Sequence, residues 1–147
     1  MKGFGSHSSI WTMNWTPEAA EHAVAEAVRH DFDFIEIALL TPPTVDAALS
    51  RALLDRAGLP AAYLLGLPEK DWPSHNPEGA IAFLKIALDK TAAMGCLALT
   101  GVTYGGIGER TGLPPTQTEL GYVDKWRTQR RIDVMSMKSR KLSAILS

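Results

Sequence analysis

The sequence predicts an α/β protein built from alternating strands and helices. Four mostly apolar segments are centred near positions 5, 36, 64 and 99, and this spacing of about 30 residues is typical of strand–helix–strand units. A segment with helix-start signals follows each of the first three. Because a helix separates consecutive strands, we expect parallel strands joined by right-handed crossovers.

Residues 2–39 predict a strand, a helix and a second strand. Lys2–Ser9 is the first strand. Thr16-Pro17-Glu18 begins the helix, because a hydroxyl cap, a proline at the first helical position and an acid near the positive end of the helix dipole all favour a start. The helix is expected to end near Asp31. Phe32–Leu39 is the second strand, mostly apolar as in a sheet that is covered on both faces.

Residues 42–95 repeat this design. After a proline pair, Thr44 is predicted to cap a second helix, which ends at Gly58 in a left-handed cap. Leu59–Leu67 is the third strand. The third helix begins at His75–Glu78 and ends at Gly95. The predicted apolar stripes of the two helices are Val45, Leu49, Ala52 and Leu53, and Ile81, Leu84, Ile86 and Leu88.

The fourth strand is predicted over Cys96–Val102, and a fourth helix begins near Thr116. Cys96 is the chain's single cysteine, so an intramolecular disulfide is excluded, and we expect a buried thiol in a reducing cytoplasm. The chain has 147 residues, of which 46% are hydrophobic and 21% charged, as in an ordinary globular domain. It contains neither an apolar run of about 18 residues nor the apolar stretch of a secretory signal.

Charge divides the chain into two regions. Residues 125–147 hold seven of the 15 basic residues but one of the 16 acidic residues. Their net charge is +6, and the 8 basic and 15 acidic residues of positions 1–124 give −7. We therefore predict a folded domain over residues 1–126 and a separate basic tail over residues 127–147.

Two parallel-sheet architectures fit the pattern. A doubly wound nucleotide-binding sheet needs a glycine-rich turn after its first strand, but the bulky segment Ile10–Trp15 stands there. The glycines of Gly105–Gly108 follow the fourth strand without the spacing of a phosphate loop. We therefore favour a (β/α)₈ barrel, which typically needs about 250 residues, with only its first four units in this chain.

In such a barrel, functional side chains lie at the carboxyl ends of the strands and in the loops that follow. Those positions hold a set suited to a sugar, because aromatic faces stack on C–H surfaces and polar groups bind hydroxyls. The set is His7, Ser8, Trp11, Trp15, Glu36, Gly66, Thr100, Thr103 and Tyr104. The tryptophans could instead only fill the barrel mouth, and Glu36 could instead form a structural ion pair.

Common catalytic and metal-binding motifs are absent. The sequence has no H-E-x-x-H, C-x-x-C, G-x-S-x-G or phosphate-loop pattern. His22 and His30 fall in the first helix and His75 in a cap region, so we expect all three at the surface.

Four segments, in order, resemble the N-terminal half of a ketose 3-epimerase. They are Phe4–Trp15, Phe32–Ile37, Leu65–Leu67 and Thr100–Tyr104. The family is that of the D-tagatose and D-psicose 3-epimerases, within the xylose isomerase-like TIM barrels. The similarity covers about residues 2–126, and its W-x-x-x-W and F-D-x-I-E motifs are the more specific ones.

The resemblance implies a metal-dependent epimerase. In the family, a divalent metal, commonly Mn²⁺, and two glutamates move a proton at C3 of the sugar through an enediolate. The resemblance implies substrate contacts at a set of positions that line or border the pocket: His7, Trp11, Trp15, Glu36, Gly66, Val102 and Tyr104. The metal ligands and catalytic glutamates belong to later motifs, E-x-x-N-R and D-x-x-H, which this sequence lacks. We therefore expect no catalytic residue, metal ligand or cofactor in this chain.

The likeness ends at Trp126, and a frameshift is our leading hypothesis for the basic tail. Three functions stay open: a truncated epimerase that is inactive alone, an active pair of half-barrels, and a non-catalytic module that binds a sugar or an anionic partner. We expect a ketose as ligand, neither a membrane nor a nucleic acid as partner, and self-association or aggregation through the open barrel edges.

Overall fold

The computed structural model describes part of the chain in detail. The described residues are 3–96, 98–103, 105, 106, 108, 114, 116, 117, 120 and 121. The chain divides into two units, Met1–Gly108 and Glu109–Ser147. In the second unit, the backbone is helical at Gln117, Leu120 and Gly121, and the Leu120 N–H donates to the Thr116 carbonyl over 3.0 Å, as the predicted start of a fourth helix requires.

The tail over residues 127–147 lies outside the described residues. The boundary at residue 126 therefore stays a prediction. None of the helices among the described residues is long and apolar enough to cross a membrane.

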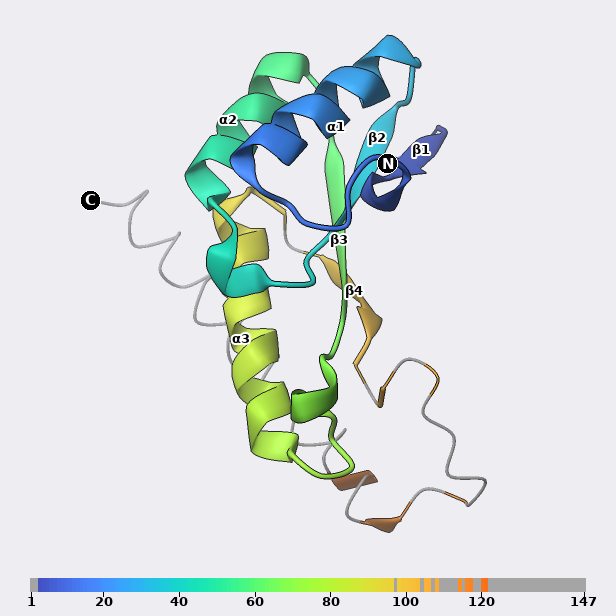
Figure 1. Cartoon of the computed structure of the whole chain (residues 1–147), viewed down its shortest axis with the longest axis vertical. Helices are drawn as coiled ribbons and strands as arrows, with labels where there is room; N and C mark the ends of the chain where they lie inside the picture. The colour runs from blue at the N-terminus through green and yellow to red at the C-terminus, as the bar shows by residue number, and fades with distance from the viewer. Residues whose placement is uncertain are drawn as a thin grey trace, which may run out of the picture. The chain divides into compact units, whose positions relative to one another are not determined.

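Four parallel strands form one sheet in the first unit (Figure 1). They are β1 (Gly5–His7), β2 (Phe34–Ala38), β3 (Ala61–Gly66) and β4 (Leu99–Val102). Their order in space, β1-β2-β3-β4, is their order in the sequence. A doubly wound sheet reverses its strand order at one point, whereas a barrel does not. The observed order confirms the predicted α/β fold with parallel strands and fits a barrel wall.

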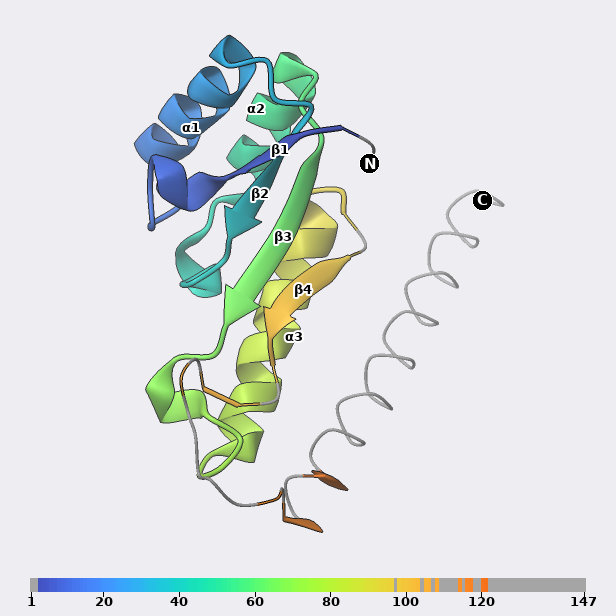
Figure 2. The ribbon, with the colours of Figure 1, turned by 90° about the vertical axis from the view of Figure 1, so that its right-hand side faces the viewer.

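Three helices cover one face of this sheet. Figure 2 shows α1 (Pro17–Arg29), α2 (Ala47–Ala57) and α3 (Pro77–Ala93) on the same side of the strands. The helices contact one another in sequence order, α1 with α2 and α2 with α3. None of the helices among the described residues covers the opposite side of the sheet, which we call the open face.

The side chains alternate between the two faces of the sheet. On β2, Ile35 and Ile37 are fully buried, while Phe34 and Glu36 between them are half-buried. Successive strand residues point to opposite faces, so the isoleucines lie against the helices and Glu36 lies on the open face. Tyr63 pairs with Ile37 and so lies on the helix-covered face. The core is therefore the layer between sheet and helices.

The first strand is shorter than predicted, because the chain turns after His7. Residues Ser8–Ile10 form a 3₁₀ helix, which we call η1. Ser8 is buried, and its Oγ accepts a hydrogen bond from the Ala38 N–H over 3.1 Å. A side chain therefore takes the place that a backbone carbonyl would have if β1 continued beside β2.

Of the predicted starts of the first three helices, two are correct. The Thr16 Oγ1 accepts from the Ala19 N–H over 3.3 Å, and the Asn76 Oδ1 accepts from the Gly79 N–H over 3.0 Å. The second helix begins later than predicted. Thr44 belongs to a short 3₁₀ turn, and Asp46 is the cap, with its carboxylate accepting from the Leu49 N–H over 2.9 Å.

The predicted stripes of α2 and α3 are wrong in part. Ala52 and Ile86 are exposed. The residues that the two helices bury are Ser50, Leu54, Ala80, Leu84, Ala87 and Thr91. These residues recur every three or four positions, so they form one stripe along each helix, and Ala52 and Ile86 lie off that stripe.

The fourth strand begins three residues later than predicted. It starts at Leu99, and Cys96 lies in the turn before it. Cys96 is half-buried, so the prediction of a buried thiol is wrong. The reason is that the strand does not extend back to the end of α3.

Tyr63 carries an uncompensated polar group in the core. Its side chain is 1% exposed, and its hydroxyl has no hydrogen-bond partner among the described residues. Burial raises the pKa of this phenol well above its usual range. The neutral form is therefore the one that the fold stabilises.

We expect Tyr63→Phe to raise the free energy of unfolding by about 1 kcal/mol at neutral pH, because it removes a hydroxyl that is buried without a partner. The native pKa lies above the unfolded value of about 10, so the wild type loses stability as pH rises above about 10. The Tyr63→Phe variant has no phenol at this position, so its stability does not fall for this reason as the pH rises. Urea unfolding of both proteins at about pH 7 and pH 10.5 measures both effects, and a destabilised Tyr63→Phe would contradict the assignment.

Candidate functional site

The open face brings two predicted site residues together, His7 at the carboxyl end of β1 and Glu36 in the middle of β2. His7 is the register partner of Glu36. Neighbouring strands lie about 4.8 Å apart, and register partners project from the same face. Both side chains are half-buried. A histidine and a glutamate therefore lie on adjacent strands of the same face, although the two residues are 29 positions apart in the sequence.

The His7 ring is held by the residue two positions further on. Its Nδ1 lies 3.0 Å from the Ser9 backbone nitrogen and 2.6 Å from the Ser9 Oγ. These contacts fix the Nδ1 edge of the ring and leave the Nε2 edge for other partners.

Glu36 is the acidic residue of this face. Among the described residues, no hydrogen bond or ion pair reaches its oxygens. The alternative of a structural ion pair therefore finds no support within this part of the chain. Its register partner on the other side is Ala62, whose methyl group leaves space beside the carboxylate.

Gly66 and Val102 extend the same face on β3 and β4. They are register partners at the carboxyl ends of the two strands. Gly66 is buried and Val102 is half-buried. Because Gly66 lies four residues beyond Ala62 on the same strand, it shares the face of Glu36 and His7.

The two tryptophans have partners within the fold. Trp15 is 6% exposed, and its Nε1–H donates to the Ser50 Oγ of α2 over 3.0 Å. The Ser50 hydroxyl in turn donates to the Asp46 carbonyl over 2.6 Å. Trp11 is half-buried and lies edge-to-face against Phe32, with ring centroids 6.2 Å apart. Tyr104 lies outside the described residues.

Two further residues at this end of the sheet were not predicted. Ser9 contacts His7, as described above. Trp72, in the β3–α3 connection, donates from its Nε1–H to the Leu67 carbonyl over 3.1 Å. A side chain at Gly106 would meet the Trp72 ring, since an added Cβ would lie 2.1 Å from Cε2. The sequence feature that could have identified Trp72 is an aromatic residue in the loop that follows the third strand.

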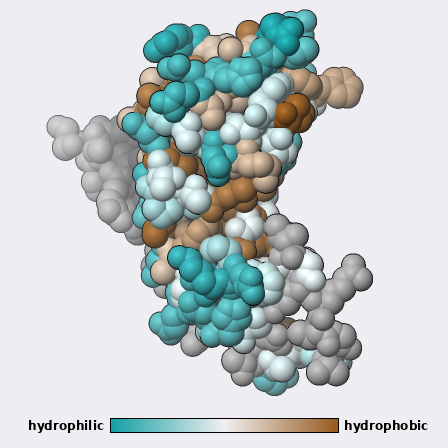
Figure 3. All heavy atoms as spheres, in the orientation of Figure 1, coloured by the Kyte–Doolittle hydropathy of each residue, from teal (hydrophilic) through white to brown (hydrophobic). Residues whose placement is uncertain are grey.

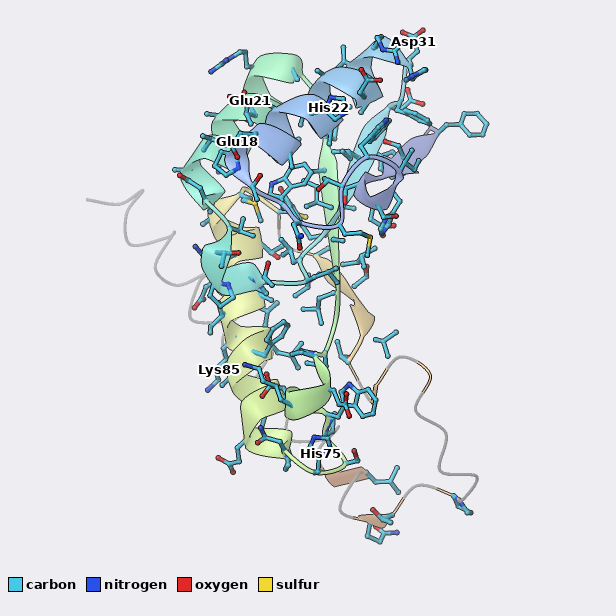
Figure 4. The ribbon with its side chains drawn as sticks, in the orientation of Figure 1. Glu18, Glu21, His22, Asp31, His75 and Lys85 are labelled. Carbon is cyan, nitrogen blue, oxygen red and sulfur yellow. The ribbon has the colours of Figure 1, made fainter. Side chains whose placement is uncertain are left out.

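The remaining histidines confirm the prediction of surface positions. His22, His30 and His75 are all exposed. Figure 4 shows His22 on α1 and His75 before α3, each at the periphery of the domain. These imidazoles do not join His7 at the strand ends.

The described residues do not fit a metal site. Among them, no three His, Cys, Asp or Glu side chains lie close enough together to hold an ion. His7 and Glu36 supply two donors at most, whereas catalytic metal sites commonly use three protein ligands. No chemical step is therefore assigned to a metal bound by these residues.

No family model matches the chain. L-ribulose 3-epimerase from Methylomonas sp. (strain DH-1) is 34% identical over 113 residues, which are 74% of this chain and 40% of that protein. The chain is a homologue of the ketose 3-epimerases. A ketose 3-epimerase from Arthrobacter globiformis is 29% identical over 107 residues, 70% of this chain and 37% of that protein.

Solved structures agree. A crystal structure of D-allulose 3-epimerase from Methylomonas sp. in complex with D-allulose matches with a TM-score of 0.77 and 32% identity, over 89% of this chain and 46% of that one. A structure of L-ribulose 3-epimerase matches in fold with a TM-score of 0.75 and 22% identity, over 88% and 45%. The chain thus spans less than half the length of these epimerases. The predicted resemblance to the N-terminal half of a ketose 3-epimerase is confirmed.

Proposed function

We propose that this chain forms one half of a ketose 3-epimerase barrel and holds the ketose against the open face of its sheet. The observation that carries the proposal is the register pair of His7 and Glu36, two polar residues on the open face, of which Glu36 has no hydrogen-bond or ion-pair partner among the described residues. His7 ends β1, and barrel enzymes bind substrates at the carboxyl ends of their strands. The homology to epimerases supports a ketose as the ligand.

The pair suits a polyhydroxylated ligand. A sugar hydroxyl can donate a hydrogen bond to the Glu36 carboxylate, and a neighbouring hydroxyl can accept one from the His7 ring. Gly66 adds no side chain to the pocket, and Val102 supplies apolar surface for the C–H face of the sugar. Trp11, Trp15 and Tyr104 complete the proposed wall, with Trp15 supporting it from beneath through its bond to α2.

The reaction itself is proposed for a complete barrel. Proton transfer at C3 through an enediolate requires general bases and a metal, and we assign none of these roles to the described residues. We therefore propose that the 147-residue chain binds a ketose but does not epimerise it. We also propose a reducing cytoplasmic location, because Cys96 has no cysteine partner within the chain.

Self-association is part of the proposal. Among the described strands, β1 and β4 each have one neighbour, and free strand edges pair with other chains. Large apolar side chains near β1 are exposed, namely Phe4, Ile10 and Met13. On the face in view, Figure 3 shows hydrophobic residues at the surface between two groups of hydrophilic residues. Both features favour contact with a further copy of the chain.

We expect Glu36→Gln to weaken ketose binding about tenfold or more, because it removes a charged hydrogen-bond acceptor. His7→Ala is expected to weaken binding about two- to tenfold. NMR titration of the full chain with D-allulose and with L-ribulose measures both. His75→Ala is the matched control, since that histidine is exposed before α3.

Unchanged affinity in both site variants would contradict the proposed pocket. Epimerisation of either sugar by the chain with added Mn²⁺ would contradict the proposal that it is inactive alone.

The basic tail favours a second candidate function, a non-catalytic module that binds an anionic partner, because residues 125–147 carry a net charge of +6. Salt-sensitive binding to anionic vesicles without any ketose binding would favour that alternative.

A further inference from the structure

We propose that Ser9 is a positioning residue, which holds His7 in the tautomer with its proton on Nε2 and so presents a hydrogen-bond donor to the ligand. This inference rests on the proposed function, because it assigns the chemistry of the same pocket. It comes from the two short contacts between Ser9 and the Nδ1 atom of His7.

The two contacts define which nitrogen carries the proton. The Ser9 backbone N–H, 3.0 Å from Nδ1, can only donate, so Nδ1 must accept and cannot carry a hydrogen. A neutral imidazole has one ring proton, which is then on Nε2. The Ser9 hydroxyl, 2.6 Å from the same nitrogen, can rotate to donate as well. The opposite tautomer would place two N–H groups against each other.

Ser9 is held in place independently of any ligand. It lies in the middle of η1, and the neighbouring Ser8 anchors this turn to β2 through its Oγ and the Ala38 N–H. The Ser8 carbonyl accepts from the N–H groups of Trp11 and Thr12 over 3.0 and 2.8 Å. The turn is thus hydrogen-bonded to β2 through the Ser8 side chain, and it is stabilised internally through the Ser8 carbonyl.

The donor on His7 and the acceptor on Glu36 together restrict which ligands fit the proposed pocket. Nε2–H of His7 requires a hydroxyl that accepts, and the Glu36 carboxylate requires one that donates. Two hydroxyls on adjacent carbons meet both requirements across strands about 4.8 Å apart. The His7 ring already has the required tautomer before the ligand binds. Less of the binding free energy is therefore used to order the site. Ser9 therefore favours ligands with a vicinal diol.

The test uses ¹⁵N NMR of the imidazole rings in the full chain at about pH 8.5, where histidines are neutral. We expect His7 to show an unprotonated Nδ1 and a protonated Nε2. Ser9→Ala keeps the backbone N–H, and with it the tautomer, but removes the hydroxyl that also holds the ring. It should therefore shift the Nδ1 resonance and weaken D-allulose binding about two- to tenfold, and Ser9→Thr, which keeps the hydroxyl, should restore both. Ser74→Ala is the control, because Ser74 lies 3.4 Å from the Nδ1 of a different histidine, His75.

A proton on Nδ1 of His7 in the wild type would overturn the inference, and so would a Ser9→Ala variant with both His7 resonances unchanged. Failure of Ser9→Thr to restore the Nδ1 resonance would also overturn it. If the tautomer and its response to Ser9 are as expected but no ketose binds, the positioning of His7 is supported and the proposed function is overturned. The two failures are therefore distinguishable.

Discussion

Gly101→Ala is expected to separate β4 from β3 and to lower the free energy of unfolding by more than about 3 kcal/mol. Gly101 has φ of 126°, a conformation that side chains disfavour. A Cβ at this position would lie 1.9 Å from the Leu65 carbonyl oxygen and 2.7 Å from the Leu65 nitrogen. These atoms belong to the backbone of β3, so relief requires the strands to move apart.

Gly58→Ala is the matched control for this variant. Gly58 ends α2 with φ of 63°, and nothing lies within 4 Å of an added Cβ. Only the conformational cost remains there, about 1–2 kcal/mol. Urea unfolding gives both values, and amide exchange locates the damage in β4. Equal destabilisation by the two substitutions would contradict the close approach of β4 to β3. Loss of β4 would also remove Val102 from the proposed pocket.

Trp15→Ala is expected to lower the free energy of unfolding by about 3–5 kcal/mol, the usual cost of truncating a buried tryptophan. The ring is 6% exposed and joins the segment before α1 to α2 through Ser50. Removal leaves a cavity there and deprives the Ser50 hydroxyl of one donor. Urea unfolding measures the loss.

Trp15→Phe separates packing from any contact with the sugar. It keeps most of the buried ring but loses the hydrogen bond to Ser50, so we expect a loss of about 1 kcal/mol and little change in ketose affinity. A large loss of affinity with nearly unchanged stability would instead indicate that Trp15 touches the ligand. A Trp15→Ala protein as stable as the wild type would contradict the burial of the ring.

The candidate site could be predicted in part. His7 could be predicted because it stands near the end of a strand, where barrel enzymes place functional groups, and Glu36 because an acid inside an apolar strand needs a partner or a function. Ser9 was missed, because a serine two residues after a histidine has no distinctive pattern in the sequence. Its role depends on the turn of η1, which forms because Ser8 bonds to Ala38 on the neighbouring strand.

The sequence by itself determined the features that depend on neighbouring residues. It located the four strands, and it identified the helix starts at Thr16 and Asn76 and the left-handed end at Gly58, because caps act within one turn of the backbone. The predicted cap of α2, Thr44, was wrong, because Asp46 two residues later also carries a suitable oxygen and is the residue that caps the helix.

Only the tertiary structure decided which faces are buried and which residues meet. Ala87 is buried and Ile86 is exposed, because Ala87 lies on the same helical stripe as the buried residues Ala80, Leu84 and Thr91, and Ile86 does not. The pairing of His7 with Glu36 depends on the register of two strands. Register is set jointly by side chains across the whole sheet, so no local stretch of sequence contains it.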